Sequence, residues 1–323
     1  MHRRSLLALP LLAAPGLARA QADWPQRTIT ILVPFVAGGP SDLVARAIAL
    51  KLPERIGGTP VVAENRPGAN GAVAAQALAR MAPDGHVLMV GSIGVYAINV
   101  ALRPNLGYDP VRDFTPITLA VTTPNVLVVN PQRVDVRTPA EFLSWLRANG
   151  ARASYSTSGV GSSDHLTTEL FKQRTGTEAT HVPYQGGAAA ATALIAGDVQ
   201  LSFQNLGTVA GHIAGGRLRA IMQTGRERHR LLPEVPTAIE AGFADFEVTS
   251  WQAVMAPGGM APALQGRIAD AVRWALLHEE TRQRLGNIGL DVVASSPAEY
   301  SAFQQAEIAR WREVVRLANI QPV

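Results

Sequence analysis

The sequence predicts an α/β fold of two lobes that are joined by two crossing strands, with a ligand cleft between the lobes. Three observations carry this prediction. Short apolar runs alternate with amphipathic segments over residues 28–90, and the same alternation restarts at residue 139. Two long extended stretches, at 114–130 and 247–256, separate and follow these regions. Alternating strands and helices indicate βαβ units, and hence parallel sheets with helices on both faces.

The first lobe begins with strands that each stop at a turn rich in glycine, proline or asparagine. The run TITILVPF ends just before a Gly-Gly-Pro turn, and leucine and alanine then recur at helical spacing. Continuous apolar character is typical of a parallel strand that is buried on both faces. The expected strands are residues 28–35, 60–64 and 87–90, and the expected helices are 42–52 and 72–81.

The second lobe is expected to lie between the two extended stretches. We expect 114–130 to leave the first lobe as a strand and 247–256 to return to it, so that the two crossings form a hinge. The first lobe would then comprise residues 21–122 and 248–323, and the second residues 123–247. The expected second-lobe helices are 139–149, 163–174 and 188–196, with strands 153–156, 180–183 and 199–203, and two further first-lobe helices are 263–277 and 297–317.

Residues 1–20 have the pattern of a secretory signal peptide. Met1 to Arg4 is basic, residues 5–17 are apolar, and Ala18-Arg19-Ala20 is a small-x-small cleavage site. The apolar run is about 13 residues long, too short to span a bilayer. We therefore expect cleavage near Ala20 and a free periplasmic protein, with the general secretory and twin-arginine routes both open.

Composition and charge exclude several classes of protein. The chain has no cysteine, which excludes disulfides, thiolate catalysis and zinc–thiolate sites. Three of its 29 basic residues lie in the signal segment, so the mature chain is nearly neutral and offers no electrostatic case for binding nucleic acid or anionic lipid. Its histidines are scattered without metal-binding spacing. We expect a monomer with no metal and no cofactor.

A strand-to-helix turn occurs in both lobes, and this pair forms the main candidate site. Ligands of open parallel sheets bind beyond the carboxyl ends of the strands. A helix start offers unpaired N–H groups and a partial positive charge, which hold an anion without a basic side chain. The candidate ligand-binding residues in these turns are Phe35, Val36, Ala37, Gly38, Gly39, Pro40, Ser41 and Asp42 in the first lobe, and Ser158, Gly159, Gly161, Ser162 and His165 in the second.

Other strand ends add five polar or small candidates. Ser92 closes the third strand of the first lobe. Tyr184 and Gly186 lie in the turn that follows residues 180–183, and each is either a cleft residue or part of a surface loop. Gln204 and Asn205 follow the last strand of the second lobe, where their side-chain amides would form hydrogen bonds with a hydroxyl or carbonyl group of a ligand.

A serine hydrolase and a nucleotide-binding protein are the alternatives that the second turn raises. Ser158 or Ser162 with His165 would supply a nucleophile and a base, but Ser162 and His165 share one helix turn and no G-x-S-x-G elbow occurs. His165 is therefore either a hydrogen-bond donor near the cleft or a helix residue with no role. The G-x-G of Gly159 and Gly161 lacks its third glycine, where Asp164 stands, and no P-loop lysine motif is present.

Seven segments carry a family resemblance, and they follow one another in order over nearly the whole mature chain. They are WPQRTITILVPFVAGGPSDLVAR, VVAENRPGANGAVAAQALARMAPDGHVL, DFTPI, YSTSGVGSSDHLTTELFK, HVPYQGGAAAATALIAGDV, GRLRAIMQTGRERHRLLPEVPTAIEAGF and EVTSWQAVMAPGG. The chain resembles the Bug-type (TctC-like) extracytoplasmic solute receptors of tripartite tricarboxylate transporters. The resemblance implies a type II periplasmic binding-protein fold that closes on a small organic anion and delivers it to a membrane permease.

The resemblance also implies where the anion is held. In that family the ligand carboxylate is held mainly by the first-lobe turn, here Phe35 to Asp42, partly through ordered waters. The second-lobe helix start corresponds to Ser158 to His165. Val36-Ala37 and Gln185 depart from residues that are common in the family, which leaves the ligand's identity open.

The expected function is therefore non-catalytic capture of a small carboxylate in a hinged cleft. A dicarboxylate, a tricarboxylate, an acidic amino acid and an aromatic acid all fit this expectation. The permease subunits of a tripartite tricarboxylate transporter are the expected partners. A periplasmic sensory subunit that binds the same ligands is the alternative that the sequence leaves open, because both need the same clamshell.

Overall fold

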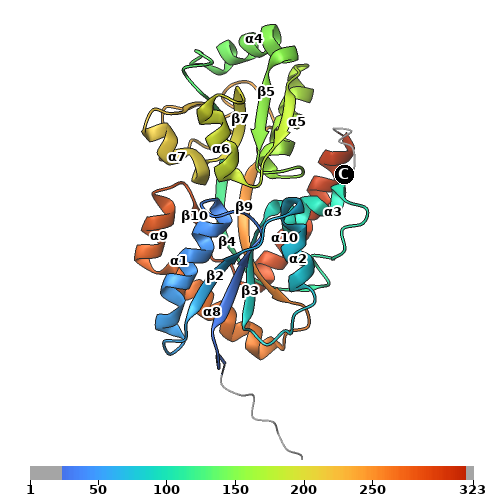
Figure 1. The fold of residues 1–323 in the computed structure, drawn as a ribbon, viewed down its shortest axis with the longest axis vertical. Coiled ribbons are helices and arrows are strands. Elements are labelled where there is room, and N and C mark those ends of the chain that lie inside the picture. The colour runs from blue at the N-terminus through green and yellow to red at the C-terminus, as the bar shows by residue number, and fades with distance from the viewer. Residues whose placement is uncertain (1–23, 318–323) are drawn as a thin grey trace, which may run out of the picture.

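The computed structural model describes residues 24–317, and the expected signal peptide lies outside them. Two α/β lobes are stacked end to end, and two long strands run from one into the other (Figure 1). The strands form one path in the order β2-β1-β3-β9-β4-β7-β5-β6, with β10 and β8 also paired to β4. The predicted fold class is confirmed.

The first lobe has helices on both faces of its sheet. α1, α8 and α9 pack on one face around Ile48, Val272 and Leu285, and α2, α3 and α10 cover the other around Tyr96 and Trp311 (Figure 1). This is the α/β/α layering that βαβ units produce. The elements are β1 (Ile29–Val33), α1 (Pro40–Arg55), β2 (Val61–Asn65), α2 (Ala72–Leu78), β3 (Val87–Ser92), α3 (Asn99–Leu102), α8 (Pro262–Leu277), α9 (Glu279–Gly286), β10 (Asp291–Val292) and α10 (Pro297–Leu317).

The second lobe repeats this layering around a smaller sheet. α4 and α5 pack with Phe142 and Phe171 on one side, and α6 and α7 pack with Leu194 and Val209 on the other. The elements are α4 (Pro139–Asn149), β5 (Ser154–Thr157), α5 (Ser163–Thr175), β6 (Thr180–Pro183), α6 (Gly187–Ala196), β7 (Leu201–Asn205), α7 (Leu206–Ala214) and β8 (Arg219–Gln223). Short 3₁₀ or π turns at 69–71, 94–98 and 150–152 complete the fold.

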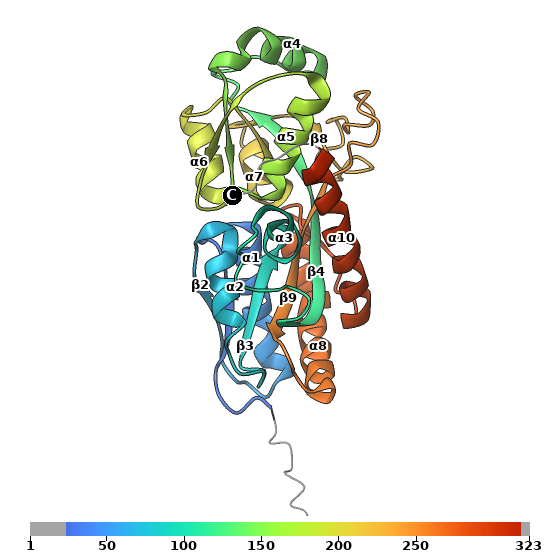
Figure 2. The same ribbon diagram turned by 90° about the vertical axis from the view of Figure 1, so that its right-hand side faces the viewer.

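The two crossing strands connect the lobes as predicted, and Figure 2 shows β4 running from the first lobe into the second. β4 (Phe114–Val129) and β9 (Thr249–Pro257) are antiparallel to each other, and their pairing runs from Phe114 opposite Pro257 to Pro124 opposite Thr249. The register shifts twice along this pair. β1 pairs in parallel with β2 and β3, and β5 pairs in parallel with β6 and β7, as predicted. β3 is antiparallel to the crossing strand β9, so the sheet as a whole is mixed.

Among the described residues, no helix is both long enough and apolar enough to cross a membrane.

Candidate ligand-binding site

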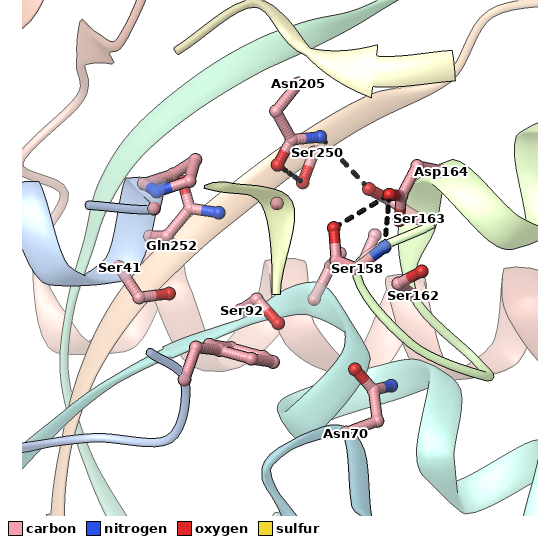
Figure 3. Close-up of a pocket in the computed structure, with 15 residues that line it drawn as sticks. Ser41, Asn70, Ser92, Ser158, Ser162, Ser163, Asp164, Asn205, Ser250 and Gln252 are labelled. Atoms are coloured by element: carbon pink, nitrogen blue, oxygen red, sulfur yellow. Dashed lines mark hydrogen bonds between the residues drawn. The ribbon is translucent and has the colours of Figure 1, made fainter. Parts of the chain in front are cut away.

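A cavity lies between the two lobes, where several strands end and several helices begin, with about 410 Å³ of space free of protein atoms, part of which is open to solvent. Figure 3 shows serine, asparagine and glutamine side chains converging on it from both lobes and from the crossing strand β9. The lining residues are Phe35, Gly39, Pro40, Ser41, Asn70, Ser92, Ile93, Ser158, Ser162, Ser163, Asp164, Gly187, Asn205, Ser250 and Gln252.

The first-lobe wall is a turn that Asp42 holds in shape from behind. Its carboxylate accepts hydrogen bonds from the Gly38 N–H, Arg46 Nε and Asn65 Nδ2, each at 2.9 Å. Asn65 also donates to the carbonyl of Phe35 at 3.0 Å. Burial raises the pKa of Asp42, but these three hydrogen bonds outweigh it and leave the pKa lowered. Asp42 is thus ionised, its carboxylate oxygens accept hydrogen bonds from groups around the turn, and the residue does not line the cavity.

Helix α1 begins at this wall without a capping side chain. Gly39 is the N-cap residue and makes no side-chain hydrogen bond to the helix, and Pro40 occupies the first turn. The N–H groups of Ser41 and Asp42 therefore have no carbonyl partner within the helix. Gly39, Pro40 and Ser41 all line the cavity. An uncapped helix start with its positive dipole end thus faces the space where a ligand would lie.

On the opposite wall, the start of α5 is organised around a buried aspartate. Asp164 Oδ2 accepts from Ser158 N and Ser158 Oγ, each at 2.7 Å, and from Gln204 Nε2 at 2.8 Å. Ser162 caps the helix by accepting from the N–H of His165 at 3.3 Å. These bonds keep the hydroxyls of Ser158 and Ser162 at the cavity wall.

Two further helices begin at the second-lobe wall, and neither has a side-chain cap. α6 follows the N-cap residue Gly186, and α7 follows the N-cap residue Asn205. The Asn205 amide instead donates to Asn125 and Ser163, and its carbonyl oxygen accepts from Ser250 of β9. Gly187 and Asn205 line the cavity. Helix starts therefore reach the cavity from both lobes.

The lining of the cavity is polar but almost without formal charge. Nine of the lining residues are serine, asparagine or glutamine, and no lysine, arginine or histidine is among them. Asp164 is the one ionisable lining residue. Anything negative in this cavity would be held by hydroxyls, amides and helix N–H groups, not by an ion pair.

A pair of stacked histidines supports the second-lobe wall from behind. The rings of His165 and His181 lie 4.1 Å apart at 17°. His165 Nδ1 accepts from the N–H of Gly161 at 3.2 Å, and His181 Nε2 lies 2.6 Å from the Thr157 hydroxyl. Burial lowers the pKa of His165 to about 4 and that of His181 to about 3. Both rings are therefore neutral near pH 7 and shape the loop without lining the cavity.

These histidines are expected to lower the stability of the folded protein in acid. The unfolded chain binds protons at the ordinary histidine pKa of 6.5, whereas the folded rings resist protonation. The free energy of unfolding is therefore expected to fall as the pH drops from 6.5 towards 4, by up to about 3 kcal/mol for His165. Urea titrations at pH 7, 5.5 and 4.5 should show a shallower decline for His181→Phe than for the wild type. Equal declines would contradict this account.

The three residues that the serine-hydrolase alternative requires, Ser158, Ser162 and His165, make other contacts in the structure. The Ser162 hydroxyl donates to the carbonyl of Gly159 at 2.7 Å, and the Ser158 hydroxyl donates to Asp164. The ring of His165 accepts from Gly161 and stacks on His181. Neither serine has the ring of His165 as its base, so the geometry is that of a structured helix start.

Eight of the 18 predicted site residues line the cavity and ten do not. Those that line it are Phe35, Gly39, Pro40, Ser41, Ser92, Ser158, Ser162 and Asn205, and those that lie outside it are Val36, Ala37, Gly38, Asp42, Gly159, Gly161, His165, Tyr184, Gly186 and Gln204. Most of the second group hold the walls in place. Gln204, for example, is fully buried and donates to Asp164 and Ser202.

Seven residues that line the cavity were not predicted from the sequence. Ser250 and Gln252 lie on the crossing strand β9, which the sequence marks as a connection and not as a wall. Asn70 has φ +50° in the turn before α2, a left-handed conformation that asparagine tolerates, and its place after a strand was the available signal. The others are Ile93, Ser163, Asp164 and Gly187.

The two lobes touch at the mouth of the cavity, so the structure is closed. A Cβ atom at Gly161 of the second lobe would lie 2.9 Å from Leu102 Cδ1 of the first. At Gly186 it would lie 3.3 Å from Val36 Cγ2. Leu166 of α5 is fully buried and belongs to the hydrophobic cluster that fills one side of the first lobe. Glycines thus allow the backbones of the two lobes to approach closely.

Two hinged α/β lobes that close on a polar cavity define a solute-binding protein. The profile of the family described as "Tripartite tricarboxylate transporter family receptor" (TctC) matches residues 44–320. The chain belongs to this family, and the resemblance found in the sequence is confirmed.

Relatives over the full length support the assignment. Protein BugT of Bordetella pertussis is 33% identical over 321 residues, covering 98% of each chain. An R. palustris protein solved with adipate is 36% identical, covers 93% of this chain and 100% of its own, and has a TM-score of 0.89. MatC from Rhodopseudomonas palustris with bound malate is 34% identical, with 90% and 100% coverage and a TM-score of 0.86.

Proposed function

We propose that this receptor captures a small organic carboxylate in the cavity between its lobes, in the periplasm, and delivers it to the permease of a tripartite tricarboxylate transporter. The observation that carries the proposal is the convergence of uncapped helix starts from both lobes on one closed cavity. Helix starts supply N–H donors and partial positive charge, which suit a carboxylate.

The remaining lining fits the same class of ligand. Hydroxyls of Ser41 and Ser92 and amides of Asn70 and Gln252 can donate to carboxylate oxygens directly or through waters. Phe35 and Ile93 offer apolar surface to a short carbon chain. The full-length relatives solved with adipate and with malate support this ligand class.

The direct test is a ligand screen on the mature protein that begins after Ala20. Thermal-shift measurements followed by calorimetry would cover dicarboxylates, tricarboxylates, amino acids and aromatic acids. We expect at least one acid to raise the melting temperature and to bind with a stoichiometry of one. A folded protein that binds no member of the panel would overturn the proposal. Capture of permease subunits from membranes by the loaded receptor tests delivery separately.

A further inference from the structure

The buried carboxylate of Asp164 has one oxygen in use and one without a partner. Its side chain is 1% exposed and lines the cavity at the first turn of α5. Oδ2 accepts three hydrogen bonds, from Ser158 N, Ser158 Oγ and Gln204 Nε2. Oδ1 is buried and accepts no hydrogen bond within residues 24–317. Three hydrogen-bond donors on one oxygen stabilise the ionised form of the carboxylate, which acts only as an acceptor.

The cavity contains nothing that balances this negative charge. No lysine, arginine or histidine lines it, and the other polar lining groups are neutral. The start of α5 supplies about half a positive charge, which offsets part of the cost of burial. A buried carboxylate is otherwise stabilised by a cation within hydrogen-bond reach. The ligand is the remaining source of such a cation.

We propose that the ligand carries an ammonium group beside its carboxylate, as amino acids do, and that Asp164 Oδ1 accepts a hydrogen bond from that ammonium. Asp164 is then the residue that sets specificity within the receptor's carboxylate site. This inference rests on the proposed function, because it adds a second contact to a ligand that the helix starts already hold by its carboxylate.

The charges of the two walls match the two ends of such a ligand. The start of α1 presents Gly39 and Ser41 with free N–H groups and a positive dipole end, which suit the carboxylate. Asp164 on the opposite wall suits the ammonium. A simple diacid would instead bring a second negative group into a closed cavity that already holds one, at a cost of repulsion. Burial also raises the pKa of Asp164, so an adjacent ammonium would stabilise its ionised form.

Matched pairs of acids with and without an amino group test this directly. Calorimetry on the wild-type protein would compare aspartate with succinate, glutamate with glutarate, and alanine with propionate. For the pair whose chain length fits the cavity, we expect the amino acid to bind at least tenfold more tightly. Malate against succinate then tests whether a neutral donor suffices. A gain from the hydroxyl equal to that from the ammonium would overturn the role of charge.

The variant Asp164→Asn removes the charge and keeps the size of the side chain. We expect it to reduce the ratio of the affinities for the amino acid and for the deaminated acid to less than threefold, whatever the change in the affinity for each. Asp135→Asn is the matched control, since Asp135 is 78% exposed and pairs with Arg219 outside the cavity, and it should keep the full preference. Melting curves would establish that both variants are folded.

The outcomes separate this inference from the proposed function. A wild-type protein that binds succinate or glutarate as tightly as the amino acid would overturn the inference and leave the carboxylate receptor standing. That result needs no variant, so it holds even if Asp164→Asn does not fold. A protein that binds neither member of any pair, nor any other acid of the panel, would overturn the proposed function itself.

Discussion

Replacing Gly39 by valine is expected to abolish ligand binding, with an affinity at least a hundredfold weaker than that of the wild type. Gly39 lines the cavity at the start of α1, and no atom lies within 4 Å of a Cβ built on it. A branched side chain would therefore occupy ligand space and cover the N–H groups of the first turn. The backbone at Gly39 is extended, at φ −85° and ψ 171°, so valine adopts it without strain.

The fold of this variant should survive, because only the preference for an N-cap residue is lost, at about 1 kcal/mol. Calorimetry and thermal melting would separate the two effects. Gly266→Val on the exposed face of α8 is the control, since its added side chain also meets no atom within 4 Å. Equal affinity in wild type and Gly39→Val would show that the ligand does not approach this helix start.

Truncating Leu166 to alanine is expected to weaken binding about tenfold by favouring the open state. Leu166 belongs to α5 of the second lobe, yet it is fully buried in a first-lobe hydrophobic cluster that includes Ile93 and Leu102. That contact exists only while the lobes are together. Loss of its apolar area costs the closed state about 1–2 kcal/mol relative to the open state, and a ligand must then supply this difference.

Calorimetry with the best ligand of the panel would measure the effect. Leu146→Ala is the control, because Leu146 is buried in the second lobe's own core and its loss should lower stability without changing affinity. If both variants bound as tightly as the wild type, Leu166 would have no part in closure. Small-angle scattering of ligand-free Leu166→Ala should also show a larger radius of gyration.

The sequence predicted the frame of the fold because its strong patterns are local. Apolar runs that end at glycine turns marked β1 and β3, and the helical spacing marked α4 and α10. Weaker elements escaped. α7 contains Gly207 and Gly211, which lower its helix propensity, and β10 is only two residues long. Such elements are stabilised by packing and pairing with elements that are distant in the sequence, and a local sequence pattern carries no information about these contacts.

The site was predictable only in part, for the same physical reason. Turns that follow a strand and start a helix can be read from sequence, which brought Gly39, Ser41 and Ser158 to the cavity. Which face of a crossing strand meets the cavity depends on how the lobes close, so Gln252 escaped. Residues such as Asp42 and His165 share the turns but point away from the cavity, and only the hydrogen bonds of the folded chain reveal this.

Because no basic side chain lines the cavity, we expect the affinity for a ligand to depend little on the salt concentration. Attraction between exposed charges fades as dissolved salt increases, with a screening length of about 10 Å at 0.1 M. Short contacts to hydroxyls, amides and helix starts inside a closed cavity are shielded from dissolved ions by the protein around them. The dissociation constant of a bound carboxylate should therefore change less than twofold between 20 and 500 mM sodium chloride.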